Sequence, residues 1–435
     1  MKVKNIFQSK ETKNASWLIS GKIIQMLLSL IIGMLTARYL GPKNYGLISY
    51  GMACVSFFTS FCTLGINNII VKEFIDNPND QGVVLGSTLV LRALSSFFSI
   101  IILNIIIKIL DKDDFFTKTI VFLCSIGLFF QIFDTFNYWF QARYQSKITA
   151  ISTFIAYAIT SGYKIILLLL GNSTQWFAFA SSLDYIVLGG VLWLFYKKQS
   201  GPPLSFSWNK GKELLKNSYH YILSGMMVVI YGQTDKLMLK QMLDGESVGY
   251  YSTATVICSM WVFILSAIID SLYPTIMKLY RIDYEEYEKK NKQLYAIVFY
   301  LSVSASLFFV LFGKYVIQIL YGREYILAEA PLKIITWYTA FSYLGVARNA
   351  WIVCEGKQKY LKYMYFSAAI INIILNYILI PLLGVSGAAI ASLITQICTS
   401  IILPLFFKEM RKNSILILQA ILLKGVLKNK KGDKK

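Results

Sequence analysis

The sequence predicts an all-α polytopic membrane protein with twelve transmembrane helices. Of its 435 residues, 56% are hydrophobic and 15% are charged, whereas globular chains carry about 25% charged residues. The apolar residues gather in blocks of roughly 20, the length that a helix needs to cross a hydrocarbon core about 30 Å thick. Because a bilayer has no water to bind exposed backbone groups, these blocks are expected to be helices.

We expect the twelve spans, in chain order, at residues 16–36, 45–64, 83–107, 119–140, 148–170, 175–195, 219–239, 248–273, 294–312, 332–353, 360–380 and 385–407. The first block is long and lacks a small-x-small cleavage site, so we interpret it as a retained span and not as a removable signal peptide. The apolar stretch 414–426 is too short to cross a bilayer, and we expect an interfacial helix there.

The net charge of +20 is distributed unevenly along the chain. If the N-terminus is cytoplasmic, the segments on that side hold 29 of the 43 Lys and Arg residues, and the segments on the opposite side hold 9. This positive-inside bias predicts that both termini are cytoplasmic. The basic end of the chain is then expected to touch anionic lipid, and nucleic acid is not an expected partner.

The longest polar stretch between spans divides the twelve helices into six and six. We therefore expect an N-terminal bundle (1–196), a cytoplasmic linker (197–218), a C-terminal bundle (219–407) and a basic tail with a possible interfacial helix (408–435). A constant offset places Leu40, Gly46 and Ser49 on Leu243, Gly249 and Ser252. This indicates either a diverged repeat or the recurrence of glycine at membrane turns. Transporters built from repeats place the substrate between the halves.

Several charged residues fall inside the predicted spans. A charge near the bilayer centre costs roughly 2.5–3.5 kcal/mol, so it should face protein or water. The first span carries one polar stripe at three- and four-residue steps, formed by Lys22, Gln25, Ser29, Gly33 and Thr36. The fifth span carries a similar stripe, formed by Thr153, Tyr157, Thr160 and Lys164. The third span carries Arg92. Three buried cations favour an anionic ligand; alternatively, each of them pairs with Asp134, Asp184, Asp235 or Asp270.

No motif for catalysis or metal binding is present in the sequence. The chain has one histidine and six cysteines without a CxxC pair, which supports neither a zinc site nor a disulfide framework. GxSxG, HExxH and P-loop motifs are absent as well. We therefore expect neither an enzyme nor a bound cofactor or metal.

Four segments together resemble one known family. The run Ala37 to Gly46 (ARYLGPKNYG) is similar to the first outer turn of polysaccharide flippases of the Wzx type, in the multidrug/oligosaccharidyl-lipid/polysaccharide exporter superfamily. The further matches are Thr234-Asp235-Lys236 with Val248 to Ser252, Leu320 to Tyr325, and Asn376 to Ala389. The resemblance covers nearly the whole chain, and the order and spacing of the segments make it specific.

The resemblance implies two six-helix bundles around a central cavity that opens alternately to the two sides of the bacterial inner membrane. The implied cargo is an oligosaccharide on undecaprenyl diphosphate, carried to the periplasmic leaflet. We expect Lys22, Gln25, Arg92 and Lys164 to bind this substrate, and Asp134, Asp235, Lys236, Asp270 and Arg348 to act in gating or ion coupling. The sequence leaves open whether Na⁺, H⁺ or no ion is coupled. Membrane lipids, a polysaccharide polymerase and a chain-length protein are the expected partners.

Two other functions stay open. A multidrug exporter of the same superfamily would bind an organic cation through buried acids. A membrane polysaccharide polymerase or glycosyltransferase would need a long periplasmic loop, and the longest outer loop expected here, residues 313–331, is short.

Overall fold

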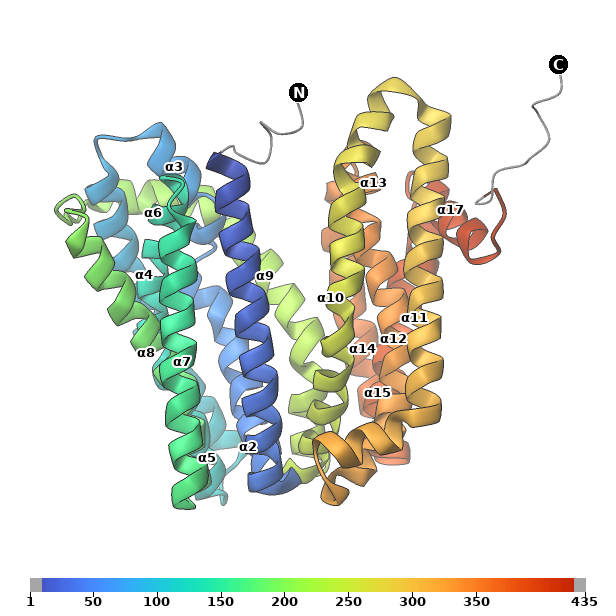
Figure 1. Ribbon diagram of the computed structural model, residues 1–435, viewed down its shortest axis with the longest axis horizontal. Helices are drawn as coiled ribbons and strands as arrows, with labels where there is room; N and C mark the ends of the chain where they lie inside the picture. Colours follow the sequence, from blue (N-terminus) through green and yellow to red (C-terminus); the bar gives the residue numbers. More distant parts are fainter. Residues whose placement is uncertain (1–9, 426–435) are drawn as a thin grey trace. The chain divides into compact units, whose positions relative to one another are not determined.

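A computed structural model describes the backbone of residues 10–425 and the side chains of residues 28–425 except Ser224. The described chain is built of helices and the turns that join them (Figure 1). It divides into two compact units within one helix: unit 1 ends at Gln233 and unit 2 begins at Thr234. This division does not test the domain bounds expected from the sequence, which stay a prediction.

Unit 1 contains the helices α2 (Lys10–Thr63), α3 (Ile70–Asp76), α4 (Gln81–Leu110), α5 (Phe115–Phe130), α6 (Thr135–Ala142), α7 (Ser146–Leu170), α8 (Thr174–Lys198) and most of α9 (Trp208–Met242). A 3-10 turn, η2 (Gln131–Asp134), joins α5 to α6. Helix α2 packs against α7 and α5, and α8 packs against both α5 and α7.

Unit 2 contains the end of α9 and the helices α10 (Gly245–Ile282), α11 (Tyr284–Leu320), α12 (Glu329–Ala347), α13 (Asn349–Cys354), α14 (Leu361–Leu383), α15 (Val385–Ile397), α16 (Leu403–Phe406) and α17 (Arg411–Ile421). A π-helical segment, η5 (Cys398–Ile402), joins α15 to α16. Helix α12 packs against α10, α11 and α15.

Nine helices of the described chain are long and apolar enough to cross a membrane. A multi-pass helical membrane protein is therefore confirmed, while the number of twelve spans stays a prediction. One of the nine, within α2, holds parts of two predicted spans. Between these two parts, Gly41 at φ 71° and ψ 169° interrupts the helix just before Pro42. Only glycine adopts such angles without strain, and proline is favoured in the first turn of the helix that follows.

Helix α4 shows how the sequence sorts its residues between protein and lipid. One stripe along it is buried and includes Arg92, Ser96 and Leu103. The opposite side exposes large apolar side chains, among them Phe97, Phe98, Ile101 and Ile105. Exposed apolar residues on this scale are typical of a surface that faces hydrocarbon.

The segment that precedes α9 is docked onto α4. A methyl group added at Gly82 would lie 2.2 Å from the Pro203 carbonyl oxygen, and one at Gly86 would lie 2.3 Å from the Ser205 carbonyl oxygen. The Ser207 amide also donates to Ser87 Oγ at 3.0 Å. The two glycines therefore allow the backbone of residues 203–205 to lie directly on α4, which fixes the segment before α9 to unit 1.

Candidate functional site

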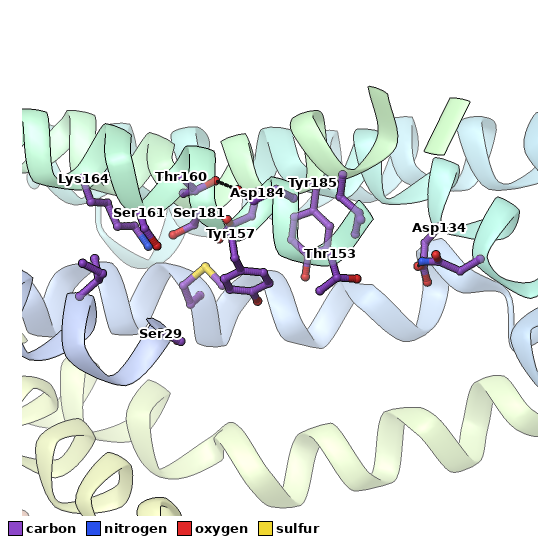
Figure 2. A pocket seen from close by; sticks show the side chains of 15 residues that line it. Ser29, Asp134, Thr153, Tyr157, Thr160, Ser161, Lys164, Ser181, Asp184 and Tyr185 are labelled. Carbon is purple, nitrogen blue, oxygen red and sulfur yellow. Dashed lines mark hydrogen bonds between the residues drawn. The ribbon is translucent and has the colours of Figure 1, made fainter. Parts of the chain in front are cut away.

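Residues of unit 1 line a polar, partly open cavity of about 490 Å³ (Figure 2). Its wall is built from α2, η2, α6, α7 and α8, and one residue, Met52, comes from the second half of α2. The lining residues include Ser29, Asp134, Asn137, Thr153, Tyr157, Thr160, Ser161, Lys164, Ser181, Asp184 and Tyr185. A cavity of this size lined by hydroxyl, amide and charged groups is large enough for a small ligand.

Helix α7 supplies the polar stripe that the sequence predicts. Thr153, Tyr157, Thr160 and Lys164 all line the cavity. Residues three and four apart share one face of a helix, so a single side of α7 presents them together. In Figure 2 Lys164 lies towards one end of the cavity and Asp134 towards the other.

The cavity brings acids and a base together. Lys164 on α7 interacts electrostatically with Asp184 on α8. Asp134 ends the 3-10 turn between α5 and α6 and accepts a hydrogen bond from the Asn137 amide. The break in the helix is what places this carboxylate at the wall.

Arg92 does not line the cavity. It is almost fully buried and donates through Nη1 to Thr135 Oγ1 at 2.8 Å and to Asn67 Oδ1 at 3.3 Å. Its Nη2 donates to the Gln131 carbonyl oxygen at 3.0 Å. Arg92 thus binds the first residue of the 3-10 turn, Gln131, and the first residue after it, Thr135, and it interacts electrostatically with Asp134. Its cost of burial is offset by hydrogen bonds to the protein.

Two other expected substrate-binding residues, Lys22 and Gln25, have side chains outside the described part of the structure. They belong to α2, whose Ser29 and Ile32 line the cavity. Their contribution stays a prediction.

Unit 2 contains a second polar centre around Asp235 of α9. This carboxylate is 4% exposed and accepts hydrogen bonds from Asn376 Nδ2 at 2.6 Å and Asn372 Nδ2 at 3.1 Å. The hydroxyls of Tyr251 and Ser392 also donate to it. Four helices therefore converge on one buried carboxylate, whose charge is stabilised by hydrogen bonds from four side chains.

Two groups beside Asp235 add to this centre. Asn376 Oδ1 is buried and has no hydrogen-bond partner among the described residues. Lys236 is partly buried next to Asp235 along α9 and interacts with it electrostatically.

Arg348 and Asp270 lie apart from this cluster. Arg348, between α12 and α13, is buried and donates to the carbonyl oxygens of Thr399 at 3.2 Å and Ser400 at 3.3 Å, both within the π-helical segment η5. Asp270 is exposed on α10.

Sequence reasoning missed part of each site. Asn137, Ser181 and Tyr185 line the cavity as well. On α8, Asp184 and Tyr185 follow Ser181 by three and four residues, and this pattern could have identified Ser181 and Tyr185. Asn372 and Asn376 carried a signal that was not used, since two amides four residues apart in an apolar helix place polar groups on one buried face.

The comparisons with known proteins agree on one group. The family model described as "Polysaccharide biosynthesis protein" matches residues 12–280. The chain is 21% identical over 411 residues to the capsular polysaccharide biosynthesis protein CapF of Staphylococcus aureus, covering 91% of this chain and 99% of that protein. It is 20% identical over 414 residues to a putative O-antigen transporter of Shigella flexneri, covering 92% and 98%.

Solved structures share the fold. The lipid II flippase MurJ in an inward closed conformation gives a TM-score of 0.71 at 13% identity, covering 94% of this chain and 92% of that chain. An inward-facing multidrug resistance transporter of the MATE family, within the MOP superfamily, gives 0.70 at 14% identity, covering 90% and 95%.

Proposed function

Because the chain belongs to the polysaccharide biosynthesis protein family, we propose that it is a flippase for undecaprenyl-diphosphate-linked oligosaccharide repeat units. It moves them from the cytoplasmic to the periplasmic leaflet of the bacterial inner membrane by alternating access. The observation that carries this proposal is a hydroxyl-rich cavity inside a membrane-spanning helical unit. The names of the relatives, a capsular polysaccharide protein and O-antigen transporters, support it.

The proposal includes the finer architecture expected from the sequence: twelve helices in two six-helix bundles around a central cavity, with both termini in the cytoplasm. It describes a transporter that carries its cargo chemically unchanged, so no catalytic residue is assigned. Membrane lipids, a polysaccharide polymerase and a chain-length protein are its proposed partners.

Within this proposal Lys164 and the α7 stripe contact the cargo, together with Lys22 and Gln25 of α2. Lys164 is the cation that lines the described part of the cavity, so it is the residue best placed for a direct contact. Arg92 acts through the wall, since it is 1% exposed and its Nη1 and Nη2 groups donate to Thr135, Asn67 and Gln131.

The Asp235 cluster is the proposed site of ion coupling. A carboxylate and the unpartnered amide oxygen of Asn376 are hard oxygen ligands that fit Na⁺, and the carboxylate alone fits a proton. Asp235, Asn376 and the Ser392 hydroxyl would hold the ion, whose positive charge would neutralise the buried carboxylate. Lys236 and Arg348 are proposed to act in gating, Arg348 by holding the π-helical segment. Asp134 and Asp270 are also proposed to act in gating or ion coupling.

A deletion strain tests the function. In a bacterium that displays a surface polysaccharide, loss of this gene should abolish surface polymer and leave single lipid-linked repeat units on the cytoplasmic leaflet. A plasmid copy should restore the polymer, and a Lys164→Met copy should do so less well at equal protein level. Intact surface polymer in the deletion strain would contradict the proposal.

A multidrug exporter is the second candidate, because two carboxylates, Asp134 and Asp184, line the cavity and could bind an organic cation. The same strain separates the two functions. Increased sensitivity to cationic drugs with unchanged surface polymer would favour the exporter.

A further inference from the structure

Among the side chains that the structure describes, the charges around the unit 1 cavity balance one another. The lining residues of the described chain include one base, Lys164, and two acids, Asp134 and Asp184. Lys164 interacts with Asp184. A site for a highly charged anion would need an excess of cations at its wall, because burying an uncompensated charge is costly.

The second acid also has a counter-charge, which lies behind the wall. Arg92 interacts electrostatically with Asp134, and its hydrogen bonds to Gln131 and Thr135 hold it at the break in the helix that carries this carboxylate. Arg92 is 1% exposed. A ligand in the cavity therefore interacts with its charge at a distance but does not form hydrogen bonds with its N–H groups.

The rest of the polar wall is uncharged. Ser29, Thr153, Ser161 and Ser181 offer hydroxyls, and Asn137 offers an amide. Tyr157 and Tyr185 add aromatic rings on the same side of the cavity in Figure 2. Hydroxyl and amide groups both donate and accept hydrogen bonds, which matches the hydroxyl and acetamido groups of a sugar.

We infer that the unit 1 cavity selects the uncharged sugar part of the cargo, and that Arg92 is a positioning residue that maintains this selectivity by balancing Asp134. This inference rests on the proposed function and narrows it to neutral glycans. Lys22 lies outside the described side chains, and an anionic probe tests whether it changes the balance.

Three soluble tetrasaccharides test the inference on the purified full-length protein in lipid nanodiscs. They are the neutral N-acetylglucosamine tetramer, the cationic glucosamine tetramer and the anionic galacturonate tetramer. By calorimetry, the neutral probe should bind about tenfold more tightly than either charged one, a difference of about 1.4 kcal/mol. Tighter binding of the anionic probe, or no binding of any probe, would overturn the inference.

Two substitutions test the role of the charges. Lys164→Met and Arg92→Met each leave one carboxylate unbalanced, so each should shift the preference towards the glucosamine tetramer by about tenfold. Arg92→Lys keeps the charge and should keep the neutral preference, while Lys314→Met on the exposed surface of unit 2 is the matched control. A loss of binding for all probes alike in Arg92→Met, with an unchanged preference in Lys164→Met, would show that Arg92 is only structural.

The proposed function can fail separately. If the nanodisc preference holds but the deletion strain keeps its surface polymer, the cavity is a neutral saccharide site of a different transporter. If the strain loses its polymer but the anionic probe binds best, the flippase stands and the neutral selectivity is wrong.

Discussion

Replacing Gly86 by alanine should loosen the segment that joins α8 to α9. In an ordinary helix interior this substitution stabilises by about 1 kcal/mol, because alanine is the better helix former. Here the new methyl group would lie 2.3 Å from the Ser205 carbonyl oxygen and 2.8 Å from the Ser205 carbonyl carbon. Both are backbone atoms, so the segment has to move away from α4.

The cost of that movement follows from the bonds that it breaks. The Ser207 amide and carbonyl both bind Ser87 Oγ, at 3.0 and 3.2 Å, and the Ser205 amide donates to the Gly82 carbonyl oxygen at 3.3 Å. Three hydrogen bonds at about 0.5–1.5 kcal/mol each outweigh the gain in helix propensity. We expect a net loss of about 0.5–3.5 kcal/mol, which raises the population of the undocked segment by a factor on the order of 2 to 400.

Limited proteolysis measures this population, because cleavage follows the open form when opening is fast. Chymotrypsin should cut at Phe206, which lies within the docked segment, faster in Gly86→Ala than in the native protein. Gly190→Ala in α8 is the control, since nothing lies within 4 Å of the added methyl group. Equal or slower cleavage in Gly86→Ala would refute the docking argument.

Three further predictions concern unit 2. Asp235→Asn should retain the fold but abolish the dependence of transport on an ion gradient, measured as cargo movement in vesicles with and without imposed Na⁺ or H⁺ gradients; an unchanged dependence would contradict ion coupling at this site. Arg348→Met removes the hydrogen bonds from Arg348 to the Thr399 and Ser400 carbonyl oxygens of the π-helical segment. It should destabilise the protein by about 1–3 kcal/mol in thermal unfolding, and Arg348→Lys should do so less. Equal stability of the native protein and both variants would show that Arg348 does not hold this segment. The hydrogen bond from Lys357 lowers the pKa of Glu409 in the folded protein. The small stabilisation from this exposed pair should therefore be present above pH about 4.3, the pKa of an unfolded glutamate, and disappear as the pH falls through the lower pKa of the folded state. Glu409→Gln should remove this pH dependence of unfolding, and its persistence in the variant would show that it has another origin.

The sequence predicted the cavity wall best where the polar pattern is local. The stripe Thr153, Tyr157, Thr160 and Lys164 lies on one face of α7 because helix geometry alone determines it. The interruption of α2 at Gly41 was equally predictable, since glycine followed by proline marks a turn.

The partners of buried charges were not predictable, because they depend on contacts between distant segments. The cost of burying Arg92 indicates that it faces protein or water, but this cost is the same whether it lines a cavity or caps a helix break. Asp235 shows the same limit, since Asn372 and Asn376 reach it from a helix more than a hundred residues away.

The most direct test of the flippase claim uses the purified protein in proteoliposomes with a lipid-linked oligosaccharide placed in one leaflet. An enzyme that modifies the glycan, added only on the opposite side, measures the amount of cargo that has crossed. We predict rapid modification with the native protein and slower modification with Lys164→Met. Modification no faster than in vesicles without protein would contradict the account.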